Sequence, residues 1–129
     1  MKRIFLAAAL SLFGSAALAQ DPAIGTWQTE VDDGSFALVQ MSQCGSAVCG
    51  TIVRTYKADG TEYESPNKGL QIVRSMSPVG NGAYEGEVFR PANDKLYIGK
   101  MKVNGDRLSL KGCVAGGLIC ANQNWKKLQ

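Results

Sequence analysis

Residues 83–90 show a clear alternation of polar and apolar side chains. Glu85 and Glu87 alternate there with Tyr84, Gly86 and Val88. A period of two residues is typical of a β-strand with one buried and one solvated face. Similar short runs recur along the chain and indicate no helix after the first twenty residues. The pattern predicts eight strands: 24–31, 36–43, a run through Val48 and Ile52, 70–76, 83–90, 96–103, 107–113 and 118–125.

Short turns separate most of these runs. Asp33-Gly34 and Gly116-Gly117 suit tight turns, since glycine adopts positive φ without strain. Eight sequential antiparallel strands favour an all-β, up-and-down barrel. A β-sandwich has the same alternation and remains the alternative. Closure is favoured by glycines in mid-strand on the expected inner face, where tight bending or close backbone approach explains them. These are Gly25, Gly50, Gly86, Gly99 and Gly112.

Residues 56–69 form the one long irregular stretch, with two glycines, a proline and several charges. Two interpretations are open. The stretch is either a solvated connection or a flap over an open end of the sheet, because long loops in small domains often bind ligands.

The first residues resemble an export signal. Lys2 and Arg3 precede an apolar run, and Ala17-Leu18-Ala19 matches a cleavage pattern. We therefore expect a signal peptide over residues 1–19, a single domain over 20–129, and a periplasmic or secreted location. The apolar run is too short to span a bilayer. Loss of two basic residues reduces the formal charge from +3 to +1, which argues against nucleic acid as a partner.

Four cysteines in an exported domain predict two disulfides, with three connectivities to choose from. We favour Cys44–Cys49 and Cys113–Cys120, because each pair is local and spans a turn. Opposed strand residues lie close enough for such a bond, and the alternation places Cys113 and Cys120 together on the outer face. A zinc site is disfavoured because no C-x2-C spacing and no histidine is present. We expect neither a metal nor a cofactor.

Several short motifs, in this order and spacing, resemble the DUF2147 family of small exported bacterial proteins without an assigned function. They are Gly25-Thr26-Trp27, Cys44-Gly45, Val48-Cys49-Gly50-Thr51-Ile52, Tyr84-Glu85-Gly86, Lys111-Gly112-Cys113 and Gln123-Asn124-Trp125-Lys126. The resemblance implies a lipocalin-like barrel. Gly25-x-Trp27 is also similar to the opening signature of lipocalins, which implies that Lys126 or Lys127 packs over Trp27.

The first functional hypothesis is a carrier or sensor of a small apolar ligand. An eight-stranded barrel is just wide enough to be filled by its own side chains or to hold one small molecule. The hydroxyl of Tyr84 or Tyr97, or Arg90 near the rim, would fix a polar head. The candidate ligand-binding residues are Trp27, Met41, Tyr84, Arg90, Tyr97, Met101 and Trp125.

The alternative hypothesis is a protein-binding module with a filled core, for example an inhibitor of an envelope hydrolase. Its surface would combine residues 56–69 with the turn at 91–95. An enzyme is the weakest interpretation, because the chain has no histidine and the two disulfides would use every thiol. We therefore expect no catalytic residue.

Overall fold

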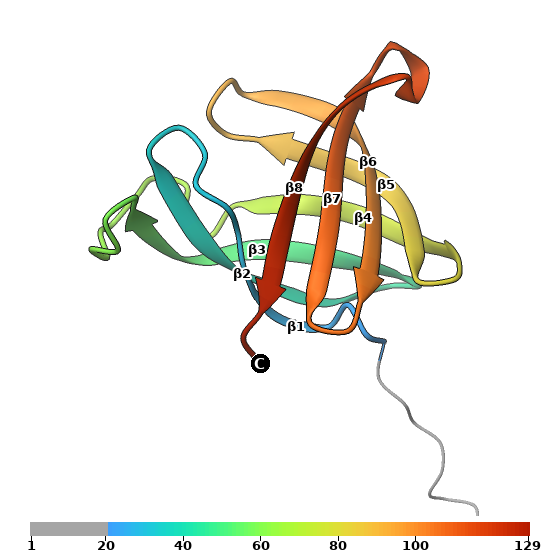
Figure 1. Cartoon of the computed structure of the whole chain (residues 1–129), viewed down its shortest axis with the longest axis horizontal. Coiled ribbons are helices and arrows are strands. Elements are labelled where there is room, and N and C mark those ends of the chain that lie inside the picture. Colours follow the sequence, from blue (N-terminus) through green and yellow to red (C-terminus); the bar gives the residue numbers. More distant parts are fainter. Residues whose placement is uncertain (1–20) are drawn as a thin grey trace, which may run out of the picture.

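The computed structural model describes residues 21–129, which form a closed antiparallel β-barrel (Figure 1). The strands follow one another around the barrel in sequence order. A 3-10 turn, η2 (Ala115–Gly117), lies between the two strands of the last hairpin. The strands are β1 (Gly25–Gln28), β2 (Ser35–Cys44), β3 (Ala47–Lys57), β4 (Gln71–Gly80), β5 (Ala83–Arg90), β6 (Lys95–Asn104), β7 (Arg107–Val114) and β8 (Ile119–Lys127).

The first and last strands close the barrel. In the antiparallel pairing of β1 with β8, Trp27 lies opposite Lys127 and Gln28 opposite Lys126. The backbone N–H of Thr26 also donates to the carbonyl of Gln129 at 2.8 Å, which extends this seam to the last residue. The predicted up-and-down barrel is therefore confirmed, and the sandwich alternative is excluded.

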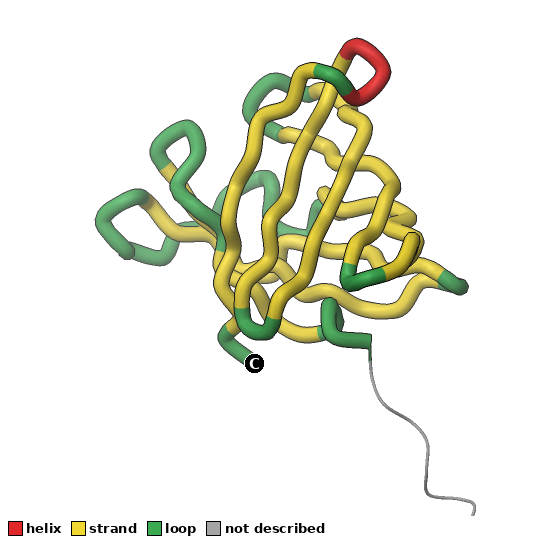
Figure 2. The backbone as a smooth tube through the Cα atoms, turned by 45° about the vertical axis from the view of Figure 1, so that its right-hand side comes forward, coloured by secondary structure: helices red, strands yellow, loops and turns green. Residues whose placement is uncertain are grey.

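The two ends of the barrel differ (Figures 1 and 2). We define the packed end as the half of the barrel next to the short turns at 45–46, 81–82 and 105–106 and to residues 21–24 and 128–129. We call open end the half that adjoins the connections at 29–34, 58–70, 91–94 and 115–118. In Figure 1 the connections at 29–34, 58–70 and 91–94 lie toward the left, and the connection at 115–118 projects at the top.

Large apolar side chains fill the packed end. Trp27, Met41, Met76 and Leu108 are fully buried there. Two inward glycines make room for the methionines. A Cβ atom added at Gly50 would lie 2.7 Å from the Met41 sulfur, and one added at Gly99 would lie 2.6 Å from the Met76 methyl. The predicted close backbone approach is confirmed at Gly86, where an added Cβ atom would lie 2.5 Å from the carbonyl oxygen of Ser75, whereas at Gly50 and Gly99 the nearest atoms belong to side chains.

The first strand is shorter than the predicted 24–31. At its start, the backbone N–H of Ile24 donates to the carbonyl of Asp21 at 3.0 Å and belongs to a turn. At its end, the hydroxyl of Thr29 accepts the N–H of Ala37 at 3.0 Å. A side chain thus takes the place of a backbone acceptor, which interrupts the regular ladder.

The last hairpin keeps its predicted register, with Cys113 opposite Cys120 and Val114 opposite Ile119. The prediction of a two-residue turn at Gly116-Gly117 is wrong. The connection comprises residues 115–118, and Ala115 adopts a φ of 55°. Leu118, which was predicted to begin the strand, lies in this turn and donates its N–H to Ala115 at 3.3 Å.

Both predicted disulfides are confirmed. Cys44–Cys49 joins β2 to β3 at the packed end, and Cys113–Cys120 joins β7 to β8 close to the open end. Every cysteine of the chain is therefore oxidised. Within residues 21–129, no group of three or more His, Cys, Asp or Glu side chains is arranged to hold a metal ion.

The predicted signal peptide lies outside the described residues. Among residues 21–129, no helix has the length and apolar character needed to cross a membrane.

Candidate functional site

A cavity of about 630 Å³ occupies the open end of the barrel. Its volume lies within the usual range for small-molecule sites. Seven of the eight strands contribute a lining side chain that points inward. From β2 to β8 these are Ala37, Ile52, Ile72, Val88, Tyr97, Leu110 and Trp125.

The floor of the cavity is apolar. Ile52, Ile72, Leu110 and Trp125 line it and are all buried within the barrel. Beyond the floor, toward the packed end, lie the fully buried side chains described above. The barrel interior is thus divided into a filled half and a hollow half. An apolar floor of this kind can take up the apolar part of a ligand.

An ion pair crosses the mouth of the cavity. Arg90 at the end of β5 donates from Nε and Nη2 to the two carboxylate oxygens of Asp32, at 2.9 and 2.7 Å. Asp32 lies in the connection that follows β1, which is four strands from β5 in the closed order. The two side chains therefore bridge opposite walls. The hydrogen bonds that Arg90 donates to Asp32 raise the pKa of Arg90 above its ordinary value.

Tyr97 lies beside Arg90 on the neighbouring strand and is half-buried. Its ring covers Gly112 of β7, where an added Cβ atom would approach the Tyr97 side chain to 3.4 Å. Its hydroxyl accepts a hydrogen bond of 2.7 Å from the side-chain amide of Asn93. The phenol thus lines the cavity with its polar tip at the mouth.

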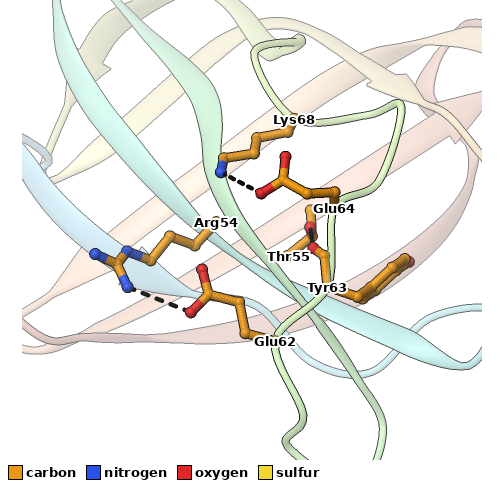
Figure 3. Close-up of polar contacts among 6 residues, drawn as sticks. All are labelled: Arg54, Thr55, Glu62, Tyr63, Glu64 and Lys68. Atoms are coloured by element: carbon orange, nitrogen blue, oxygen red, sulfur yellow. Dashed lines mark hydrogen bonds and ion pairs between the residues drawn. The ribbon is translucent and has the colours of Figure 1, made fainter.

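The connection at 58–70 forms part of the wall. Regular pairing of β3 with β4 ends at Thr51 and Gln71. From there toward the open end, β3 is hydrogen-bonded to the connection instead of to β4. The N–H of Gly69 donates to Ile52 at 2.8 Å, and the N–H of Tyr63 donates to Thr55 at 3.0 Å. The Thr55 hydroxyl donates to the Tyr63 carbonyl in return (Figure 3).

Two exposed ion pairs add to this attachment, Arg54–Glu62 at 3.4 Å and Lys68–Glu64 at 3.0 Å. Figure 3 shows the Tyr63 ring turned away from both pairs, and Tyr63 lines the cavity. Exposed pairs contribute little stability, so the backbone bonds carry most of the attachment. The connection combines the two interpretations: residues 58–62 are exposed to solvent, whereas Tyr63, Ser65 and Asn67 line the cavity as part of its wall.

The structure separates the seven predicted ligand-binding residues into two groups. Arg90, Tyr97 and Trp125 line the open-end cavity. The other four lie in the packed end, outside that cavity, and they are Trp27, Met41, Tyr84 and Met101. The last two also border a hollow of about 180 Å³ beside Lys100 and Lys102.

Polar contacts fix the packed end. The Tyr84 hydroxyl donates to the carboxylate of Asp21, and burial is the main cause that raises the pKa of Tyr84. The indole N–H of Trp27 donates to the carbonyl of Ala23 at 2.9 Å. Lys127 lies over the Trp27 ring, with Nζ 5.6 Å from its centre. The implied contact of a basic residue with Trp27 is therefore confirmed, and Lys127 makes it.

Several lining residues were not predicted, among them Asp32, Thr55 and Tyr63. Alternation along a strand distinguishes inward-facing from outward-facing residues, but it does not show where along the barrel axis a residue lies. The number of residues between a position and the nearest tight turn could have indicated this. Residues a few positions from turns 45–46, 81–82 and 105–106 lie in the packed end, whereas those near the longer connections face the cavity.

The sequence model of a bacterial family described as "Uncharacterized protein conserved in bacteria (DUF2147)" matches residues 25–127. This match covers every strand of the barrel. The chain belongs to the DUF2147 family. The resemblance inferred from the motifs is thus confirmed. A comparison of this DUF2147 protein with curated proteins found no match.

A solved structure shares the fold of this DUF2147 protein. It is that of protein HP1028 from the human pathogen Helicobacter pylori, which is described as belonging to the lipocalin family. The TM-score is 0.69 with 17% sequence identity, and the match covers 82% of each chain. At this identity the likeness establishes a lipocalin-like fold.

Proposed function

We propose that the protein binds one small amphipathic molecule in the open-end cavity. The observation that carries this proposal is the hollow of about 630 Å³ with an apolar floor and a polar mouth. A barrel whose interior is filled along its whole length would have no room for a ligand. Here only the packed end is filled.

The cavity also suggests how the ligand lies. The apolar part would contact Ile72, Leu110 and Trp125, since these side chains form the floor. The polar head would lie at the mouth beside Arg90 and Tyr97. Arginine has five N–H donors, and Asp32 accepts only from Nε and Nη2. The remaining donors can bind an acceptor on the ligand head.

Binding is a better hypothesis than catalysis. The chain contains no histidine, and both disulfides are formed, which leaves no thiol as a nucleophile. Arg90 and Asp32 neutralise one another at the mouth. We propose therefore that the ligand leaves the site chemically unchanged.

We further propose that the protein is exported and acts in the periplasm or outside the cell. The export-like pattern of residues 1–19 and the two disulfides support this location. Mass spectrometry of the protein recovered from the periplasmic fraction tests it. We expect an N-terminus near Gln20. A protein retained in the cytoplasm with Met1 intact would contradict the proposal.

Ligand binding is tested by native mass spectrometry and thermal unfolding with two probes, dodecanoic acid and dodecan-1-ol. We expect a one-to-one adduct and a raised Tm with both probes, because both have an apolar chain and an acceptor head. Arg90→Gln should weaken binding of the acid more than binding of the alcohol. Lys102→Gln, whose side chain bonds to Asn81 near the packed end, is the matched control. No adduct and no rise in Tm with either probe would contradict the proposal.

A further inference from the structure

The tip of the β7–β8 hairpin is apolar and exposed. Leu118 is 86% exposed and Ile119 65% exposed, and Val114 beside them is also exposed. The sequence between Lys111 and Lys126 contains no charged residue. The other three connections at the open end all carry charges, such as Asp32, Glu62 and Asp94. This hairpin tip therefore differs from the rest of the rim.

The hairpin tip has a fixed shape. Cys113–Cys120 ties the two strands together one residue pair before Val114 and Ile119. The turn beyond contains Gly116 and Gly117 in a compact 3-10 turn. Ile119 and Leu118 are thus held in place before they meet a partner, so docking would require little further ordering of the chain.

Strands β7 and β8 connect the hairpin tip directly to the cavity. Gly112 on β7 and Ala121 on β8 both line the cavity and are paired with one another. Both lie only a few residues from Leu118. A surface that receives the hairpin tip is therefore brought to the mouth of the cavity. Figure 1 shows the β7–β8 hairpin projecting at the top of the barrel.

Two lysines lie close to the hairpin tip, and Glu85 of β5 lies opposite one of them, Lys100. Lys100 and Lys111 lie opposite one another on the outer face of β6 and β7. Like charges in this position repel each other, and an anion between them would relieve the repulsion. The Lys100 ammonium also reaches the hairpin tip, since a Cβ atom added at Gly117 would lie 3.2 Å from its Nζ.

We propose that the hairpin tip docks the protein on an anionic phospholipid surface. Leu118 and Ile119 would enter the boundary between headgroups and acyl chains, and Lys100 and Lys111 would lie over the phosphates. An apolar tip beside lysines is the combination that favours such an interface. A docked protein would exchange its ligand with the bilayer. That purpose rests on the proposed ligand binding, whereas docking itself does not.

The experiment is flotation of the purified protein with two kinds of vesicle, one of phosphatidylglycerol and phosphatidylcholine and one of phosphatidylcholine alone. We expect flotation with the anionic vesicles, weaker flotation with the neutral ones, and loss of binding as salt increases. Lys100→Gln combined with Lys111→Gln should weaken binding about thirtyfold. Lys102→Gln, which removes a lysine on the same face nearer the packed end, should have a smaller effect.

Leu118→Ser combined with Ile119→Ser should weaken binding at least about tenfold, because the inserted apolar surface is lost. Val79→Ser is the matched control. It removes an exposed apolar side chain at the packed end and should leave flotation unchanged.

The proposal would be overturned if the wild type did not float with anionic vesicles, which is the result expected if the hairpin tip binds only a protein. It would also be overturned if the Leu118→Ser, Ile119→Ser variant floated as well as the wild type. The third contrary result is an equal loss of flotation in Val79→Ser and in that double variant. Titration with dodecanoic acid without vesicles separates the two proposals. A protein that binds the acid but does not float refutes docking alone. A protein that floats but does not bind the acid refutes ligand binding alone.

Discussion

The two tryptophans are almost equally buried, at 0% exposed for Trp27 and 2% for Trp125, but their surroundings differ. Trp27 donates to the chain at Ala23 and lies beneath Lys127. Trp125 donates to the side chain of Gln123 at 2.7 Å, and both residues line the cavity. Low exposure thus has two meanings in this barrel. Trp27 belongs to a filled interior, and Trp125 to the wall of a hollow one.

This difference suggests a division of labour between the ends. The packed end contains most of the largest fully buried side chains, residues 21–24 and 128–129, and three tight turns, and we infer that it supplies most of the stability. The open end retains a hollow that costs packing contacts. An eight-stranded barrel can be filled by side chains or can hold one small ligand. This barrel is filled at the packed end and hollow at the open end.

The largest expected effect compares two leucines on the same strand and the same inner face. Leu108 is fully buried opposite Trp125 in the packed end, whereas Leu110 lines the cavity. Leu108→Ala should reduce the free energy of unfolding by about 3–5 kcal/mol, because a closed cavity would remain. Leu110→Ala should cost about 2 kcal/mol or less, since the wall already lacks neighbours on one side.

Urea unfolding measures both changes, and titration with dodecanoic acid provides the second readout. Leu110→Ala should alter the affinity for the acid, while Leu108→Ala should leave it nearly unchanged. Equal losses of stability and equal changes in affinity would break the proposed distinction between the ends.

The two disulfides provide the next comparison, because one lies at the packed end and the other close to the open end. Loss of either by paired Cys→Ala replacement should cost about 2 kcal/mol in the loop-entropy account, since both loops are short. Removal of Cys44–Cys49 should leave ligand affinity intact. Removal of Cys113–Cys120 should also weaken ligand binding, because this bond lies beside the cavity wall. Unfolding and ligand titration on the same two variants check this, and a loss of affinity confined to the Cys44–Cys49 variant would speak against it.

The pH dependence of stability that arises from Tyr84 tests the packed end alone. Tyr84→Phe should cost about 1 kcal/mol at neutral pH through loss of its hydrogen bond to Asp21. Burial and this bond raise the pKa of Tyr84 above the ordinary 10.0, so the folded state holds the phenol proton more tightly than the unfolded state. The corresponding stability is complete below pH 10 and is lost as the pH rises above it.

The wild type should therefore lose more stability than Tyr84→Phe between about pH 9 and about pH 11. The difference between the two unfolding curves removes the contribution of the lysines, which both proteins share. Parallel curves would show that the Tyr84 phenol is not held in this way.

The smallest expected effect on stability concerns the ion pair across the mouth. Both side chains of Arg90–Asp32 are more than a third exposed, so solvent screens the pair and Asp32→Asn should cost less than about 1 kcal/mol. Because the pair bridges opposite walls, its loss should accelerate both association and dissociation of dodecanoic acid. Stopped-flow kinetics measures this, and unchanged rates would indicate that the ligand enters beside the pair.

The fold could be predicted because its signals are local. Alternation at 83–90, tight turns and inner-face glycines indicated the strands and their closure. The Gly116-Gly117 pair predicted the register of the last hairpin, with Cys113 opposite Cys120, although the turn itself is longer than predicted. Errors arose where a side chain or an unusual backbone replaced regular pairing, as at Thr29 and at Ala115.

The candidate site could be predicted only in part. The sequence indicated that Trp27, Met41 and Trp125 point inward, but not that two of them lie below the cavity floor. Asp32 could not be predicted as a site residue, because its contact with Arg90 joins residues that are far apart in sequence and meet only once the barrel closes. Long-range geometry of this kind has no local pattern.

The most direct test of the central claim is the tryptophan emission of two single-tryptophan variants, Trp27→Phe and Trp125→Phe, during titration with dodecanoic acid. A ligand on the cavity floor contacts Trp125 and does not reach Trp27. We predict that the emission of Trp27→Phe changes with a saturating one-to-one curve and that the emission of Trp125→Phe stays constant. A ligand-dependent change that persists in Trp125→Phe and disappears in Trp27→Phe would contradict the account.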